Sequence, residues 1–140
     1  MLDSSNFVLY NSDNSTIWQS FDHPTDTLLP SQHLLVQKVL GSSVSDSNHS
    51  TGRFMLLMQQ DGYLVMYPVE TPYTIEYGYW NYVTPGQENN AKLNLDDNGQ
   101  HYLDSMNGKA GTVDLNLGDN STKGLHYLLR IDADGILSLY

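Results

Sequence analysis

The sequence predicts an all-β protein, and three observations lead to that prediction. The chain of 140 residues contains 10 tyrosines and 11 glycines, and aromatic side chains suit half-buried strands whereas glycine suits tight turns. Four short segments alternate apolar and polar residues around a polar turn, which is the pattern of a β-hairpin. No segment keeps the 3.6-residue apolar period of an amphipathic helix. The length suits a single core of moderate size.

The four hairpin patterns also indicate internal repeats. They are FVLY-NSDNS-TIWQS (7–20), FMLLMQQ-DG-YLVMYP (54–68), LNLDD-NG-QHYL (93–103) and HYLLRIDA-DG-ILSLY (126–140). Aligning the ends of the last three places Tyr67, Leu103 and Tyr140 in register, at spacings of 36 (103 − 67) and 37 (140 − 103) residues. A near-constant period predicts repeated β-units around a pseudo-axis.

The polar run from Gly41 to Gly52 separates the first hairpin from the repeats. Because it is rich in serine and has glycine at both ends, it is predicted to be a surface loop or a junction between units. The predicted organisation is therefore a first hairpin unit at 1–33, a Ser-rich junction at 34–52, and the repeats at 53–140.

The charge of the chain excludes several classes of partner. With 16 acidic and 6 basic residues the formal net charge is −10, so a nucleic acid, whose phosphates require neutralisation, is not expected as a partner. Anionic membrane surfaces are disfavoured for the same reason.

The chain has no cysteine, no apolar run of transmembrane length, and no secretory signal pattern after Met1. Asn-x-Ser/Thr glycosylation sequons occur at Asn14, Asn48 and Asn120, with Asn48 the favoured acceptor.

The segment MQQDGYLVMYP (58–68) carries an unusual strand face. In a β-strand every second side chain lies on one face, so one face would combine an amide, a carboxylate and aromatic hydroxyls around a valine. A core face would be apolar throughout, and a purely solvated face would not need the valine. The mixture is typical of a small recognition surface formed by Gln59, Asp61, Tyr63, Val65 and Tyr67.

This face and the segment WQSFDHPTDTLLPSQ (18–32) resemble the bulb-type mannose-binding lectin domain found in plant S-locus-type (G-type) lectin receptor kinases. The resemblance implies a β-prism of short antiparallel strands with pseudo-threefold repeats, and a sugar site on the strand motif Q-x-D-x-N-x-V-x-Y. In that motif polar groups bond mannose hydroxyls and the valine touches the carbon face of the sugar. Neither a metal nor a cofactor is implied.

Carried over position by position, the motif is best kept by the 59–67 strand, where Tyr63 replaces the asparagine of the family. The resemblance therefore implies that Gln59, Asp61, Tyr63, Val65 and Tyr67 contact a mannose-type glycan. The first hairpin is a degenerate second site that keeps Asn6, Val8 and Tyr10. The third hairpin keeps Asp97, and the last keeps Asp134 and Tyr140. None of these three hairpins, the first included, is predicted to bind sugar.

The resemblance also implies an extracellular or cell-surface location and a chain that starts inside one lectin unit and continues into another. A competing hypothesis is a protein-interaction or self-assembly module that has lost sugar binding, associating through exposed β-edges.

No catalytic motif is present, so an enzyme is not expected. Asp22, His23 and Asp26 are interpreted as turn residues rather than a metal site. Trp18 is predicted to fill the core.

Overall fold

The computed structural model describes residues 5–83, 91–105, 108–112 and 127–140. Within these ranges the chain forms short strands and two single-turn 3-10 helices, η1 (Ser20–Asp22) and η2 (Ile75–Tyr77). The strands are β1 (Val8–Tyr10), β2 (Thr16–Gln19), β3 (Thr27–Leu28), β4 (His33–Leu34), β5 (Val39–Ser45), β6 (Asn48–Met58), β7 (Tyr63–Pro68), β8 (Trp80–Val83), β9 (Lys92–Leu95), β10 (His101–Ser105), β11 (Gly108–Thr112), β12 (Leu129–Ile131) and β13 (Leu137–Leu139).

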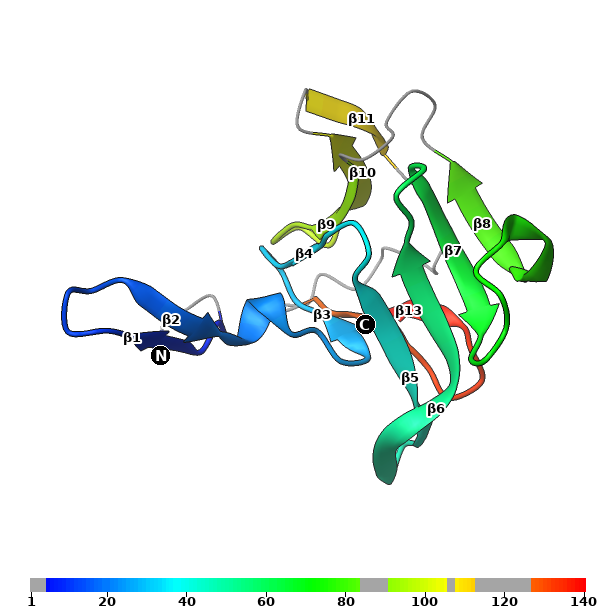
Figure 1. Cartoon of the computed structure of the whole chain (residues 1–140), viewed down its shortest axis with the longest axis horizontal. Helices are drawn as coiled ribbons and strands as arrows, with labels where there is room; N and C mark the ends of the chain where they lie inside the picture. The colour runs from blue at the N-terminus through cyan, green and yellow to red at the C-terminus, as the bar shows by residue number, and fades with distance from the viewer. Residues whose placement is uncertain (1–4, 84–90, 106–107, 113–126) are drawn as a thin grey trace.

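Three antiparallel sheets surround one core, and a two-stranded ribbon projects from them (Figure 1). The strand orders are β5-β6-β7-β8, β11-β10-β9-β4 and β13-β12-β3, and the ribbon is β1-β2. Strands β3 and β4 pair with β12 and β9, so segments from the start of the chain complete two of the sheets. The predicted all-β prism is confirmed.

The core lies between the inner faces of the three sheets. Alternation along each strand directs every second side chain inward, and each sheet contributes fully or almost fully buried leucines to one cluster. Its members from the three sheets include Leu28, Leu34, Leu40, Leu56, Leu64, Leu93, Leu103, Leu129 and Ile131. Trp80 is half-buried against this cluster.

Three Gly-containing turns repeat one geometry. Gly62, Gly99 and Gly135 have φ of 85°, 76° and 85°, a region that favours glycine because it has no Cβ. The amide of each glycine donates to the carbonyl three residues earlier, over 3.2, 3.1 and 2.9 Å. The spacings of these glycines, 37 (99 − 62) and 36 (135 − 99) residues, define the repeat of the prism.

The turns correct the predicted alignment of the third hairpin by one residue. Counting five positions from each turn glycine aligns Tyr67 and Tyr140 with Asp104, and not with Leu103. Leu103 is fully buried in the core. Because a shift of one residue moves a strand side chain to the other face, the outer face of this hairpin carries Tyr102 and Asp104 instead of Asp97 and Leu103.

The run from Gly41 to Gly52 is a hairpin, so its prediction as a surface loop is wrong. Residues 39–45 form β5 and residues 48–58 form β6, with irregular pairing on either side of Ser43. Ser42 is buried, and its hydroxyl accepts the amide of Phe54 over 3.1 Å. Serine and glycine occur here because the two strands approach closely: a Cβ on Gly52 would overlap the Ser43 carbonyl. Small side chains allow the strands to pair.

The β1–β2 ribbon projects away from the prism (Figure 1) and exposes apolar side chains. Phe7, Leu9 and Ile17 are 52%, 47% and 66% exposed, and Trp18 is 38% exposed. Trp18 stacks on the ring of His23, with 5.3 Å between ring centroids. The prediction that Trp18 fills the core is therefore wrong, because within the described residues no second sheet covers the ribbon.

Candidate functional site

Strand β7 separates core residues from the candidate sugar-contact residues. Leu64 and Met66 face the core, while Tyr63, Val65 and Tyr67 lie on the opposite, outer face of the sheet. Gln59 and Asp61 belong to the turn that precedes the strand. The structure thus brings all five residues of the predicted site to one region of the outer face.

The side chain of Gln59 is the centre of the polar contacts in this region. Its Nε2 donates to the hydroxyl of Tyr67 over 2.6 Å and to the backbone carbonyl of Tyr73 over 3.2 Å. These bonds use both donors of the amide nitrogen and leave the amide oxygen as an acceptor. The ring of Tyr73 lies against that of Tyr67, with 5.8 Å between centroids.

Asp61 holds the turn and also presents a carboxylate to solvent. Its Oδ1 accepts the amide of Tyr63 over 3.1 Å, and the residue is exposed. An aspartate that bonds the amide two residues later is a standard turn arrangement. The same arrangement recurs at Asp134, whose Oδ1 accepts the amide of Ile136 over 3.0 Å. Asp61 and Asp134 therefore have the same role in their turns. A ligand of Asp61 would bond the other carboxylate oxygen, Oδ2.

Val65 and Tyr67 are completely buried, although they lie on the outer face. They form a small apolar cluster with Met55 and Leu57 of β6, and Tyr63 packs against its edge. Burial is the largest cause that raises the pKa of Tyr67, Asp61 raises it further, and the hydrogen bond from Gln59 opposes both. The phenol is therefore a neutral hydroxyl at physiological pH.

The cover over this cluster is the connection from β7 to β8, residues 69–79, which we name the strap. Gly78 of the strap lies so close to Val65 that a Cβ there would be 2.5 Å from the valine Cγ1. The amide of Tyr79 donates to the carbonyl of Met66 over 3.0 Å. Sequence reasoning missed this cover. Two features of the sequence indicate it: the connection between the two strands is too long for a tight hairpin turn, and it contains Gly78, which has no side chain to prevent close approach to β7.

A hollow of about 530 Å³ opens beside the strap. It is lined by Gln37, Val39, Leu57, Met58, Gln59, Gln60, Asp61 and Tyr73. The hollow combines amide and carboxylate groups with exposed apolar surface, since Val39 is 40% exposed. Hydroxyl-bearing ligands with apolar carbon faces need that combination, because their hydroxyls require hydrogen-bond partners and their C–H groups pack on apolar surface.

The degenerate second site does not assemble in the same way. Asn6 Nδ2 donates to Gln19 Oε1 over 2.9 Å, and Asn6 Oδ1 accepts the amide of Phe21 over 3.2 Å. Asn6 therefore joins β1 to η1. Val8 is half-buried on the ribbon, and Tyr10 is 55% exposed.

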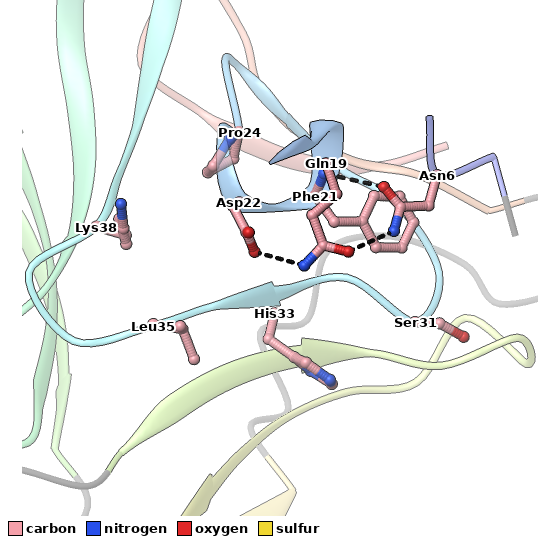
Figure 2. A pocket seen from close by; sticks show the side chains of 9 residues that line it. All are labelled: Asn6, Gln19, Phe21, Asp22, Pro24, Ser31, His33, Leu35 and Lys38. Atoms are coloured by element: carbon pink, nitrogen blue, oxygen red, sulfur yellow. Dashed lines mark hydrogen bonds between the residues drawn. The ribbon is translucent and has the colours of Figure 1, made fainter. Parts of the chain in front are cut away.

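Asn6 and Gln19 line the edge of another hollow, of about 610 Å³, between the ribbon and β4 (Figure 2). Gln19 lies between Asn6 and Asp22, and its Nε2 donates to the Asp22 carboxylate over 3.0 Å. His33 lies across the hollow from Gln19, and Lys38 lies at the end of the hollow away from Asn6 (Figure 2). The polar groups along the ribbon thus bond one another rather than converging on a central point.

The last hairpin places a closed ionic network at the equivalent of the sugar site. Asp132 Oδ1 accepts Nε of Arg130 over 2.8 Å, and its Oδ2 accepts the hydroxyls of Ser138 and Tyr140 over 2.7 and 2.8 Å. Burial raises the pKa of Asp132, but these bonds together outweigh it and lower the pKa below its usual value. The carboxylate stays ionised and is bonded within the protein.

Two of the three predicted glycosylation sequons have an exposed asparagine. Asn14 is exposed at the tip of the ribbon with φ of 64°. Asn48 is exposed at the start of β6, and its Oδ1 accepts the amide and hydroxyl of Ser50. Asn120 lies outside the described residues. Asn14 and Asn48 are therefore sterically open to modification.

Two further properties concern only the part of the chain that the structure describes. There, no group of three or more His, Asp or Glu side chains is arranged to hold a metal ion. Among the same residues, no helix has the length and apolar composition needed to cross a membrane.

Comparison with known sequences identifies related proteins. A family model described as D-mannose binding lectin matches residues 1–49. A G-type lectin S-receptor-like serine/threonine-protein kinase of Oryza sativa subsp. indica is 36% identical over 141 residues, which cover 100% of this chain and 17% of that protein. A protein of the same description from Oryza sativa subsp. japonica is 35% identical, with the same coverage. The chain thus spans less than a fifth of the length of the curated relatives it matches.

Comparison with solved structures identifies plant lectins. The Colocasia esculenta agglutinin, solved with mannose bound, is 26% identical; the match covers 83% of this chain and 86% of that chain, with a TM-score of 0.58. The Remusatia vivipara lectin is 27% identical over the same shares, with a TM-score of 0.57. The mannose-specific agglutinin of snowdrop (Galanthus nivalis) is 20% identical over 82% of this chain and 88% of that chain, with a TM-score of 0.58, and supports the fold alone.

Proposed function

Because the chain belongs to the bulb-type, D-mannose binding lectin family, we propose that it binds a mannose-type glycan in the hollow beside β7. Gln59 and Asp61 supply the hydrogen bonds, Val39 supplies apolar surface at the wall of the hollow, and Tyr63 lies at the edge of the neighbouring apolar cluster. The observation that carries the proposal is the convergence of Gln59 and Asp61 on one hollow at the family's sugar motif.

The hydrogen-bonding capacity of these groups supports a neutral, hydroxyl-rich ligand. The amide oxygen of Gln59 and the exposed oxygen of Asp61 are acceptors that match sugar hydroxyl donors. Hydrogen bonds to a carboxylate are stronger than those between neutral groups. The net charge of −10 disfavours anionic glycans. The preference for mannose is inferred from similarity, since the Colocasia esculenta agglutinin was solved with mannose bound.

The same family membership supports a non-catalytic role and a location at the cell surface. The sequence relatives are described as receptor-like kinases, and this chain matches less than a fifth of their length. We assign to it the glycan-binding part of such a receptor, not the kinase activity. Of the predicted first unit at 1–33, the exposed apolar ribbon β1–β2 supports a place in a neighbouring lectin unit, whereas β3 and the β5–β6 hairpin, which includes much of the predicted junction at 34–52, belong to the same prism as the repeats of 53–140.

A matched pair of substitutions tests the glycan site. Asp61→Asn and Asp134→Asn both preserve an oxygen that can accept the turn amide, but only the first removes a carboxylate from the hollow. Titration calorimetry with methyl α-mannoside is expected to show weaker binding for Asp61→Asn, by about tenfold, and unchanged binding for Asp134→Asn. Equal affinities for the two variants would contradict the proposed site.

A further inference from the structure

The strap, residues 69–79, occupies the side of β7 from which a saccharide would reach Val65 and Tyr67. Both residues have no exposed surface, although the family resemblance assigns the valine and the tyrosine of the motif to direct sugar contact. Gly78 lies over Val65, and the Tyr73 ring lies beside Tyr67. In the structure described, therefore, a ligand in the hollow can reach Gln59 and Asp61 but not the two buried residues.

The strap also satisfies the hydrogen-bonding group that a sugar would use. The carbonyl oxygen of Tyr73 accepts a hydrogen bond from Gln59 Nε2 over 3.2 Å. A sugar hydroxyl oxygen bound to this nitrogen would take the place of that carbonyl oxygen. The second donor of the same nitrogen is bonded to Tyr67. The strap thus provides both an acceptor and an aromatic surface at the motif.

We propose that the strap is an intramolecular cover that competes with the glycan for the 59–67 motif, and that engagement of Tyr67 requires the central part of the strap, around Tyr73, to lift. This inference rests on the proposed function of the same site. Tyr73 is the competing residue, through its carbonyl oxygen and its ring.

The ends of the strap are fixed to the prism. The amide of Val69 donates to the carbonyl of Arg53 over 2.8 Å, and the amide of Tyr79 donates to the carbonyl of Met66 over 3.0 Å. The Tyr79 hydroxyl donates to the carbonyl of Gly135 over 2.6 Å. These bonds hold both ends in place, so lifting need not detach the strap from the sheet.

The centre of the strap is held mainly by itself. The amide of Tyr77 donates to the Thr74 carbonyl over 3.0 Å, and the amide of Gly78 donates to the Ile75 carbonyl over 3.2 Å. Tyr73, Ile75 and Tyr77 are 60%, 44% and 51% exposed. A segment with few buried apolar contacts opens at low free-energy cost compared with a core strand, so the centre is the part able to move.

A closed cover lowers the apparent affinity of the site. When only a fraction of molecules is competent to bind, the observed dissociation constant rises by the inverse of that fraction. Weakening the cover without changing Gln59, Asp61, Val65 or Tyr67 must then strengthen glycan binding. Tyr73→Ala removes the ring that lies beside Tyr67, whereas Tyr77→Ala removes an exposed ring of the same strap and is the matched control.

The experiment combines calorimetry with a chemical probe of Tyr67. Methyl α-mannoside is titrated into the wild-type chain and both variants, and nitration of Tyr67 by tetranitromethane is followed by peptide mass spectrometry. For Tyr73→Ala we expect about three- to tenfold tighter binding and faster nitration of Tyr67. For Tyr77→Ala we expect wild-type behaviour in both assays.

The outcomes separate this inference from the function on which it rests. Equal or weaker mannoside binding by Tyr73→Ala, with binding by the wild type intact, overturns the cover and leaves the glycan site standing. Unchanged nitration of Tyr67 in Tyr73→Ala also overturns the cover. Absence of mannoside binding by all three proteins overturns the proposed function and this inference together.

Discussion

The hydroxyl of Tyr79 donates a hydrogen bond to the backbone carbonyl of Gly135 over 2.6 Å, although the two residues are 56 positions apart. Tyr79 ends the strap, and Gly135 forms the turn between β12 and β13. The Tyr79 ring also meets the edge of Phe54, with 5.7 Å between centroids. This contact therefore joins two sheets of the prism at the end of the glycan-site cover.

The substitution Tyr79→Phe is expected to lower the free energy of unfolding by about 0.5–1.5 kcal/mol, because it removes this hydrogen bond and keeps the ring. Urea denaturation followed by circular dichroism measures the change. Tyr77→Phe, at an exposed position of the same strap, is the control and is expected to leave stability unchanged. Equal stability of Tyr79→Phe and the wild type would show that the contact between the sheets is not stabilising.

The same tyrosine predicts a loss of stability at high pH. Burial, and to a lesser degree the charge of Asp134, raises the pKa of Tyr79 to about 12 from the usual 10.0. A pKa that is higher in the folded than in the unfolded state means that the protonated tyrosine favours folding. The stabilisation of the folded state by protonated Tyr79 is therefore fully present below about pH 10 and is lost as pH rises toward 12. Stability measured across this window is expected to fall less steeply for Tyr79→Phe than for the wild type. A parallel decline of both proteins would contradict the assignment.

The exposed apolar ribbon predicts self-association. Because Phe7, Leu9 and Ile17 are each about half exposed or more, and both edges of the ribbon are unpaired among the described strands, pairing with a second copy would bury them. Light scattering coupled to size exclusion is expected to show concentration-dependent dimers, suppressed by Ile17→Lys. Ile136→Lys, at a 58% exposed position of the prism, is the control. A monomer at every concentration would contradict this prediction.

Tyr63 predicts a gain of glycan affinity on substitution. It occupies the position at which the lectin motif has asparagine, and its single hydroxyl is displaced by the ring, so it cannot reproduce the amide contacts. Tyr63→Asn is expected to strengthen binding of methyl α-mannoside by about 3- to 100-fold, equivalent to one or two hydrogen bonds of ~0.5–1.5 kcal/mol. Calorimetry measures the gain, and Gln59→Ala in the same background is expected to abolish it. A folded Tyr63→Asn variant without a gain would contradict a sugar role for this position.

Local turn chemistry made most of the fold predictable from sequence. The residues around Gly62, Gly99 and Gly135 favour hairpins because glycine accepts positive φ, and all three form turns in the structure. The register of the third hairpin was not predictable from strand ends alone. Leu103 and Asp104 are adjacent, and only packing against the other sheets decides that Leu103 faces the core.

The candidate site was predictable as a set of residues but not as a surface. Alternation along 59–67 correctly places Val65 and Tyr67 on the outer face. Their complete burial depends on the strap, whose path over β7 is set by Gly78 and by distant partners such as Gly135. A repeat pattern contains no information on such contacts. Trp18 illustrates the reverse case, since its strand pattern suggests a core while the ribbon leaves it partly exposed.

The central claim, that Gln59 and Asp61 bind a mannose-type glycan, is tested most directly by nuclear magnetic resonance. Methyl α-mannoside is titrated into the ¹⁵N-labelled chain while the Gln59 side-chain amide and the backbone amides of 61–63 are observed. The equivalent turn at 134–136 serves as an internal control, because it has the same geometry. The account predicts saturable shifts at Gln59 and at 61–63, with none at 134–136. Unchanged Gln59 and Asp61 resonances at saturating mannoside would contradict it.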